Sequence, residues 1–190
     1  MRNCVIFIFV ISSFAFSDRR NKALELAEQA ILQTKKTVRY DPAYVRIPYP
    51  NGDVPVGTGV CTDLVIRAYR GIGIDLQKKV HEDMITAFAE HPKHWKLKRP
   101  DPNIDHRRVP NLMTFFKREG GELTVSDKTE DYLPGDLVTW NLQGKNSTAG
   151  ITHIGIVTNK KAGSGRYLIA HNIGRGNELE DMLFQFRIIG

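Results

Sequence analysis

Residues 57–65 read GTGVCTDLV, and this stretch decides the fold because a glycine-containing loop enters a helix here. From Cys61 onward, apolar side chains recur every three or four residues, which is the spacing of a helix with one buried face. The expected helix covers residues 61–71 and ends at a glycine, a common helix stop. The sequence therefore places a cysteine at the start of a buried helix.

The number of cysteines in the mature protein depends on the N-terminus. Residues 1–17 combine Arg2, an apolar run and a small-residue site that ends in AFS. This layout is typical of a secretory signal peptide, and a retained single-pass anchor is the alternative. Removal of the leader discards Cys4, so Cys61 is then the one cysteine and has no disulfide partner. We therefore expect an exported protein, periplasmic or secreted, whose thiol serves as a nucleophile.

Residues 18–190 are long enough for a single domain with a buried core. No other segment is apolar enough to cross a membrane, so no stable membrane insertion is expected once the leader is gone. The 27 basic and 21 acidic residues give a formal charge of +6, which falls to +5 when Arg2 leaves. Basic and acidic residues are interspersed, and dinucleotide and phosphate motifs are missing. We therefore expect neither a nucleic-acid partner nor a cofactor.

Helical spacing dominates the first two-thirds of the chain, and strand patterns dominate the last third. Helices are expected over residues 19–37, 61–71, 81–90 and 111–118, with a long loop rich in proline and glycine at 40–59. Strands are expected at 137–140, 154–158, 167–170 and 183–187. Helices followed by strands predict an α+β domain in which N-terminal helices pack on a C-terminal antiparallel β-sheet.

A cysteine nucleophile needs help to become a thiolate. The start of a helix lowers a thiol pKa, and an imidazole can take the proton. His153, at the start of an expected strand, is the candidate base. His171, at the end of the next strand, is placed to orient it, and Asn172 competes for that role because alternation puts only one of them on the inner face. An inert buried Cys61 and a structural His153 are the alternatives.

Four separated motifs resemble those of the NlpC/p60 papain-like superfamily. They are GVCTDLV at 59–65, GDLVTW at 135–140, HIGIV at 153–157 and AHN at 170–172. The match is closer to a bacterial group of exported proteins catalogued only as a domain of unknown function, which also shows the segment DPNIDHRRVPNL at 101–112. The resemblance implies a papain-like fold, with Cys61 as nucleophile, His153 as base and then acid, and His171 as the orienting residue.

Substrate contacts are expected from two further places. Tyr49 resembles a tyrosine that donates to the oxyanion in related peptidases, beside the backbone N–H of Cys61. The second place is the densest charged cluster, which we call the carboxylate clamp because arginine pairs well with the free carboxylates of peptidoglycan stem peptides; it consists of Asp105, His106, Arg107 and Arg108. The alternative is a structural salt-bridge knot. Asn172 completes the substrate-binding candidates.

These features predict a cysteine hydrolase, a peptidase or amidase that cleaves an amide bond in peptidoglycan or in another peptide substrate through an acyl-enzyme. One alternative is a non-catalytic envelope binding module, favoured by Thr62 and Asp63, where many cell-wall peptidases have serine and glycine. Another is an acyltransferase or amidase with a substrate outside the wall. No metal site is expected, because Pro92 breaks the helical spacing between His91 and His94. The residues define no inhibitor partner.

Overall fold

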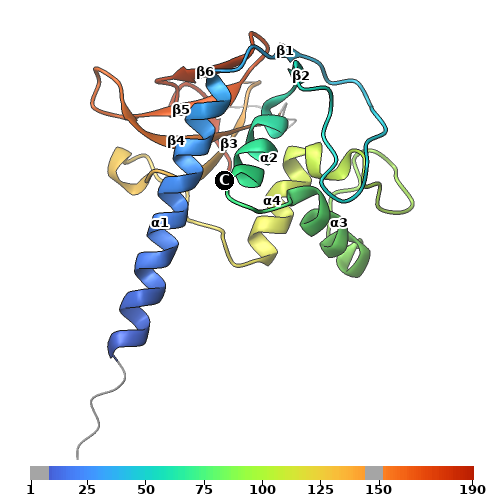
Figure 1. The fold of residues 1–190 in the computed structure, drawn as a ribbon, viewed down its shortest axis with the longest axis horizontal. Helices are drawn as coiled ribbons and strands as arrows, with labels where there is room; N and C mark the ends of the chain where they lie inside the picture. Colours follow the sequence, from blue (N-terminus) through green and yellow to red (C-terminus); the bar gives the residue numbers. More distant parts are fainter. Residues whose placement is uncertain (1–8, 144–151) are drawn as a thin grey trace, which may run out of the picture.

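The computed structural model describes residues 9–143 and 152–190, which form an α+β fold with an antiparallel five-stranded sheet (Figure 1). The helices are α1 (Phe9–Thr34), α2 (Cys61–Gly71), α3 (Leu76–Ala87) and α4 (Val109–Arg118), with the short 3-10 helices η1 (Asp105–Arg107) and η2 (Thr129–Asp131). The sheet has the order β6-β5-β4-β3-β7 and consists of β3 (Leu137–Asn141), β4 (Thr152–Lys161), β5 (Tyr167–Asn172), β6 (Asn177–Glu180) and β7 (Arg187–Ile188). A separate parallel pair joins β1 (Arg39–Tyr40) to β2 (Thr58–Gly59). The expected α+β class is confirmed.

The sheet has a helical layer on one face and a layer of turns on the other. Ile154 and Ile156 face α1, α2, α3 and α4, whose apolar stripes form one core cluster with them. Trp140 and Ile169 belong to the second cluster, which residues 182–184 cover. Both faces of the central strands are therefore buried, and a polar side chain on these strands must find its partner inside the protein.

Strand register puts both candidate histidines on the face away from the helices. His153 lies opposite Trp140 in the β3–β4 ladder, so the two side chains share a face. In the β4–β5 ladder Ile156 lies opposite Ala170, and both face the helices. Side chains alternate along a strand, so His171, which follows Ala170, points away from the helices.

Gly155 allows β4 and β5 to approach closely at this point. A Cβ atom on Gly155 would lie 2.6 Å from Cγ2 of Ile169 and 3.2 Å from Cβ of His171. The first distance is shorter than van der Waals contact allows, so any side chain at position 155 would displace its neighbours. The HIGIV motif therefore needs glycine at position 155 so that β4 and β5 can pack closely beside the histidines.

Helix α1 crosses the helical layer, and its N-terminal half extends beyond the rest of the fold (Figure 1). It begins before the expected start at residue 19, because residues 9–34 contain neither proline nor glycine to interrupt it. At its other end, Asn177 Nδ2 donates a 3.0 Å hydrogen bond to the backbone oxygen of Gln33. This bond ties the end of α1 to the start of β6.

Two other expected elements differ from the observed ones. Helix α3 starts at Leu76 rather than at residue 81, because the Asp75 side chain caps it by accepting the N–H of Lys78 at 3.2 Å. The expected strand at 183–187 is mostly wrong: residues 183–186 form a turn that buries Leu183, whose carbonyl accepts the Trp140 indole N–H at 2.9 Å, and only Arg187 lies in a strand, β7. The sheet has β7 at this edge and β6 at the other, and β6 was not expected because its residues are mostly polar.

Within the described part of the chain, no helix combines the length and the hydropathy needed to cross a membrane. Residues 1–8 of the expected leader lie outside the described residues, and residues 9–17 continue into α1. The signal peptide and export therefore stay predictions.

Candidate active site

Cys61 is the first residue of α2, and Asp63 holds this helix start in place. Oδ2 of Asp63 accepts the backbone N–H of Val60 at 2.7 Å, which satisfies one of the unpaired donors at the helix start. Asp63 also accepts from Arg107, at 2.8 Å from Nε and at 3.0 Å from Nη2. Both side chains are almost fully buried. The ion pair therefore ties the helix that carries Cys61 to η1.

The Cys61 side chain is only 6% exposed and packs in the helical core. This burial raises the pKa of the Cys61 thiol to about 11, although backbone N–H groups of Ile154 and Thr62 hydrogen-bond to the sulfur and act in the opposite direction. We expected the helix start to lower this pKa, and that expectation is wrong because desolvation is the larger effect. Cys61 is therefore a protonated thiol at neutral pH.

Two histidines and a glutamate form a hydrogen-bonded chain across the neighbouring strands β4, β5 and β6. Nε2 of His153 lies 3.0 Å from Nδ1 of His171, and Nε2 of His171 lies 2.9 Å from Oε2 of Glu180. The two rings are nearly perpendicular and both are buried. Trp140 packs against His153 with ring centroids 5.8 Å apart. Because the chain uses Nε2 of His153, the nitrogen available for chemistry is Nδ1.

Both imidazoles of this chain are neutral at pH 7. Burial lowers the pKa of His153 to about 3, and a positive charge on His171 would lower it further. Burial also lowers the pKa of His171, while the Glu180 carboxylate acts against this shift. Since Cys61 is a neutral thiol, the free protein holds no thiolate–imidazolium pair.

The thiol and the histidine chain contact neighbouring residues of β4. Ile154 donates its backbone N–H to the Cys61 sulfur, and it directly follows His153 in β4. Among the described residues, no hydrogen bond joins the sulfur to the His153 imidazole. Strand alternation points the His153 imidazole away from the helical core in which Cys61 packs, so the imidazole and the sulfur lie on opposite faces of the sheet in this structure.

Asn172, the competing orienting residue, lies on the helix-facing side of β5. Its Nδ2 donates to Oδ1 of Asn177 at 3.2 Å, and its Oδ1 accepts the backbone N–H of Gly174 at 3.1 Å. These bonds hold the turn between β5 and β6. Strand alternation thus brings His171, and not Asn172, to His153.

Tyr40, which the sequence analysis did not select, is the tyrosine close to Cys61. It pairs with Gly59 in the short β1–β2 ladder and is 38% exposed. Burial raises the pKa of Tyr40, and a negative charge on Cys61 or Asp63 raises it further. Tyr49, the expected oxyanion donor, instead packs edge-on against His81 of α3, with centroids 5.1 Å apart.

The expected carboxylate clamp lies inside the fold. Arg107 is held by the buried ion pair that starts α2, and Arg108 pairs with Asp105 at 3.1 Å and stacks over Trp95. Burial lowers the pKa of His106 to about 4, with the nearby Arg107 charge as a smaller cause. The arrangement favours the structural alternative, and a role in substrate binding stays a prediction.

Sequence reasoning also missed Glu180. Residues 177–180 read NELE, and polar composition hid the strand, although the glutamates two residues apart could have indicated a shared face. In the described part of the chain, no group of three or more His, Cys, Asp or Glu side chains is arranged to hold a metal ion.

Comparisons with known proteins found one family model and a similar bacterial protein. A family model described as Domain of unknown function (DUF1287) matches residues 27–190. The Uncharacterized protein YijF of Escherichia coli (strain K12) is 51% identical over 170 residues, which cover 90% of this chain and 80% of that protein. No solved structure matches the chain. The relation to the NlpC/p60 superfamily stays a proposal.

Proposed function

We propose that the chain, which belongs to the family described as Domain of unknown function (DUF1287), is an exported cysteine hydrolase that cleaves an amide bond in peptidoglycan stem peptides or cross-links. The observation that carries the proposal is the buried chain of His153, His171 and Glu180. His153 directly precedes Ile154, whose backbone N–H hydrogen-bonds to the Cys61 sulfur. Buried imidazoles carry a desolvation penalty. Apolar side chains would fill the same space without it, so a role in proton transfer explains the histidines better than packing does.

The arrangement of parts also supports a papain-like fold of the NlpC/p60 kind. A cysteine begins a buried helix that packs on an antiparallel sheet, and a base and its orienting residue follow on adjacent strands. These are the types of nucleophile, base and orienting group that cysteine peptidases use, although both imidazoles point away from the helical core that holds Cys61. The four sequence motifs that resemble the superfamily fall on these same elements.

The proposed reaction starts from a neutral thiol and a neutral imidazole. With a thiol pKa of about 11 and an imidazole pKa of about 3, charge separation before attack is unfavourable. The proton would therefore move from the Cys61 sulfur to Nδ1 of His153 as the sulfur attacks the carbonyl carbon of the substrate, a step that requires the His153 side chain to leave the face away from the helices and reach the sulfur. The C–S bond forms, and the π electrons of the carbonyl move to its oxygen.

The intermediate then collapses to an acyl-enzyme. The C–N bond breaks, the proton on His153 passes to the leaving nitrogen, and a thioester to Cys61 remains. Water gives a proton to the same imidazole nitrogen and attacks the thioester, which releases a carboxylic acid and restores the thiol. The oxyanion of both steps needs donors, and we assign the backbone N–H of Cys61 and, in place of Tyr49, the hydroxyl of Tyr40.

Incubation of the purified protein with defined muropeptides tests this function. We expect new amine and carboxylate termini by mass spectrometry, and none with Cys61→Ala. Tyr49→Phe is the matched control for Tyr40→Phe: only the second should slow turnover, because Tyr40 is the tyrosine close to Cys61. Products that are identical for wild type and Cys61→Ala would reject the hydrolase.

A non-catalytic binding module is the second candidate, and the burial of Cys61 favours it. Iodoacetamide labelling combined with binding to peptidoglycan sacculi separates the two functions. A binding module should bind sacculi equally with and without Cys61→Ala, and substrate should not accelerate labelling. If Cys61 is the nucleophile, a non-cleavable substrate analogue that brings His153 to the sulfur should change the rate at which iodoacetamide labels Cys61.

A further inference from the structure

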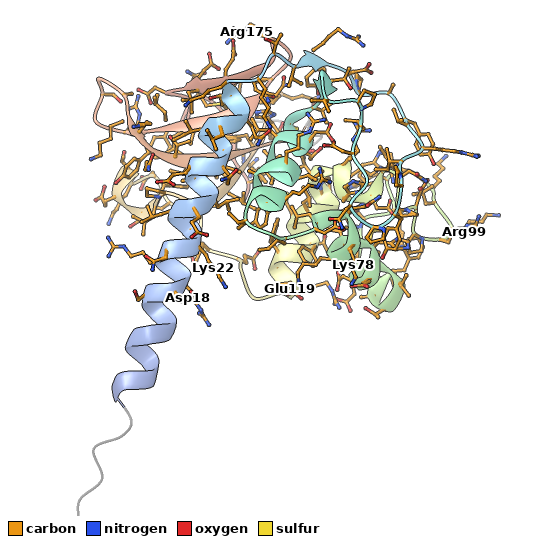
Figure 2. The ribbon with its side chains drawn as sticks, viewed as in Figure 1. Asp18, Lys22, Lys78, Arg99, Glu119 and Arg175 are labelled. Carbon is orange, nitrogen blue, oxygen red and sulfur yellow. The ribbon has the colours of Figure 1, made fainter. Side chains whose placement is uncertain are left out.

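Glu180 ends the histidine chain at the edge of the sheet. Its Oε2 is bonded to His171, while its Oε1 forms an ion pair with Arg175 at 2.6 Å. Arg175 lies in the turn between β5 and β6 and reaches the molecular edge in Figure 2. The titratable and charged groups around His171 are His153 from β4, Glu180 and Glu178 from β6, and Arg175 from the turn.

The hydrogen bonds of this chain have only one consistent direction when both imidazoles are neutral. A carboxylate accepts and cannot donate, so Nε2 of His171 must carry a proton. Nδ1 of that ring is then an acceptor, and Nε2 of His153 must donate to it. A neutral His153 protonated at Nε2 has its lone pair at Nδ1. This is the nitrogen to which the proposed reaction assigns the thiol proton.

We propose that Glu180 is a positioning residue that acts through His171 to fix the tautomer of His153, so that Nδ1 of His153 is always the basic nitrogen. The proposal rests on the hydrolase function proposed above. Without Glu180, His171 loses the acceptor that distinguishes its two nitrogens, and the other tautomer of each ring becomes accessible. The carboxylate also stabilises the positive charge that His153 acquires during attack, because two hydrogen bonds through His171 connect the carboxylate to that imidazole.

The geometry provides a matched control on the same strand. Glu178 also forms an ion pair with Arg175, at 3.0 Å, and lies opposite His171 in the sheet register. Its carboxylate has no hydrogen bond to His171, whose Nε2 is bonded to Glu180. Glu178→Ala therefore removes the same charge from the same strand and leaves the chain intact.

The test combines ¹⁵N spectra of histidine-labelled full-length protein with muropeptide kinetics. In the wild type at pH 7 we expect His171 and His153 to carry their protons on Nε2. Glu180→Ala should give mixed tautomers of His171 and lower kcat about 10- to 100-fold with little change in KM, as expected when a group that orients another is removed. Glu180→Gln retains an acceptor oxygen, so it should keep the tautomers and recover part of the rate. Glu178→Ala should match the wild type in both measurements.

The outcomes separate this inference from the function on which it rests. A wild-type His171 protonated on Nδ1 would overturn the inference whatever the activity, and this result needs no variant to fold. Full activity in a folded Glu180→Ala protein would also overturn it and leave the hydrolase standing. If no hydrolysis depends on Cys61, the proposed function fails, and the role of Glu180 in catalysis fails with it.

Discussion

Replacement of Asp63 by asparagine should destabilise the protein severely and loosen the start of α2. Oδ1 of Asp63 accepts from Nε of Arg107, and Oδ2 accepts from both Nη2 of Arg107 and the N–H of Val60. Asparagine has only one acceptor oxygen, and its NH2 group takes the place of the other. That NH2 group must therefore face an N–H of the guanidinium or the N–H of Val60, and neither of these donors can accept its hydrogen. The guanidinium, with a side chain 2% exposed, also loses its counter-charge. Removal of one partner from a buried pair costs roughly 3–5 kcal/mol.

Urea unfolding followed by circular dichroism measures this cost. A loss of ~3–5 kcal/mol is a large part of the ~5–15 kcal/mol by which native domains are stable. The double variant Asp63→Asn, Arg107→Met should recover part of it, because no uncompensated charge stays buried. Glu122→Gln breaks the exposed pair with Lys117 and should leave the midpoint almost unchanged. A small effect of Asp63→Asn, or a double variant less stable than the single one, would refute the reasoning.

Further predictions concern the sheet and the buried histidines. Gly155→Ala should lower the melting temperature and reduce turnover, because the new Cβ overlaps β5, whereas Gly163→Ala, whose Cβ meets open space, should do neither. Acid should also weaken the fold. The pKa values of His153 and His106 fall from the usual 6.5 to about 3 and about 4, so the unfolded chain binds protons that the folded chain excludes. The stability from these groups is complete above pH 6.5 and is lost as pH falls toward 4 and 3. His106→Gln should flatten the profile of urea midpoint against pH, and an unchanged slope would contradict this origin.

The sequence allowed good prediction where local pattern decides structure. The apolar spacing after Cys61 gave the bounds of α2, and the HIGIV and AHN motifs located two of the central strands. Prediction failed where distant packing decides. In the expected strand at 183–187, residues 184–187 alternate apolar and polar side chains, but the indole of Trp140 and the second core hold residues 183–186 as a turn. Polar β6 was missed because pairing with β5, not hydrophobicity, makes it a strand.

The candidate site was predictable to a similar extent. The placement of Cys61 on a helix start follows from a periodicity that the sequence displays, whereas the choice between His171 and Asn172 stayed open until the structure placed His171 beside His153. The thiol pKa does not, because it depends on how deeply the rest of the chain buries the sulfur. The burial of the carboxylate clamp could not be predicted either, because Arg107 pairs with Asp63, which is far away in the sequence.

The bond between Asn177 and the end of α1 has a consequence for biosynthesis. The first helix of the chain anchors the strand that carries Glu180, and that strand is made long after Cys61 and its helix. During synthesis Cys61 is therefore made well before the hydrogen-bonded chain of His153, His171 and Glu180 is complete. An amide hydrolase assembled in this order would remain inactive as a nascent chain and would acquire its reactivity only when β6 joins the sheet.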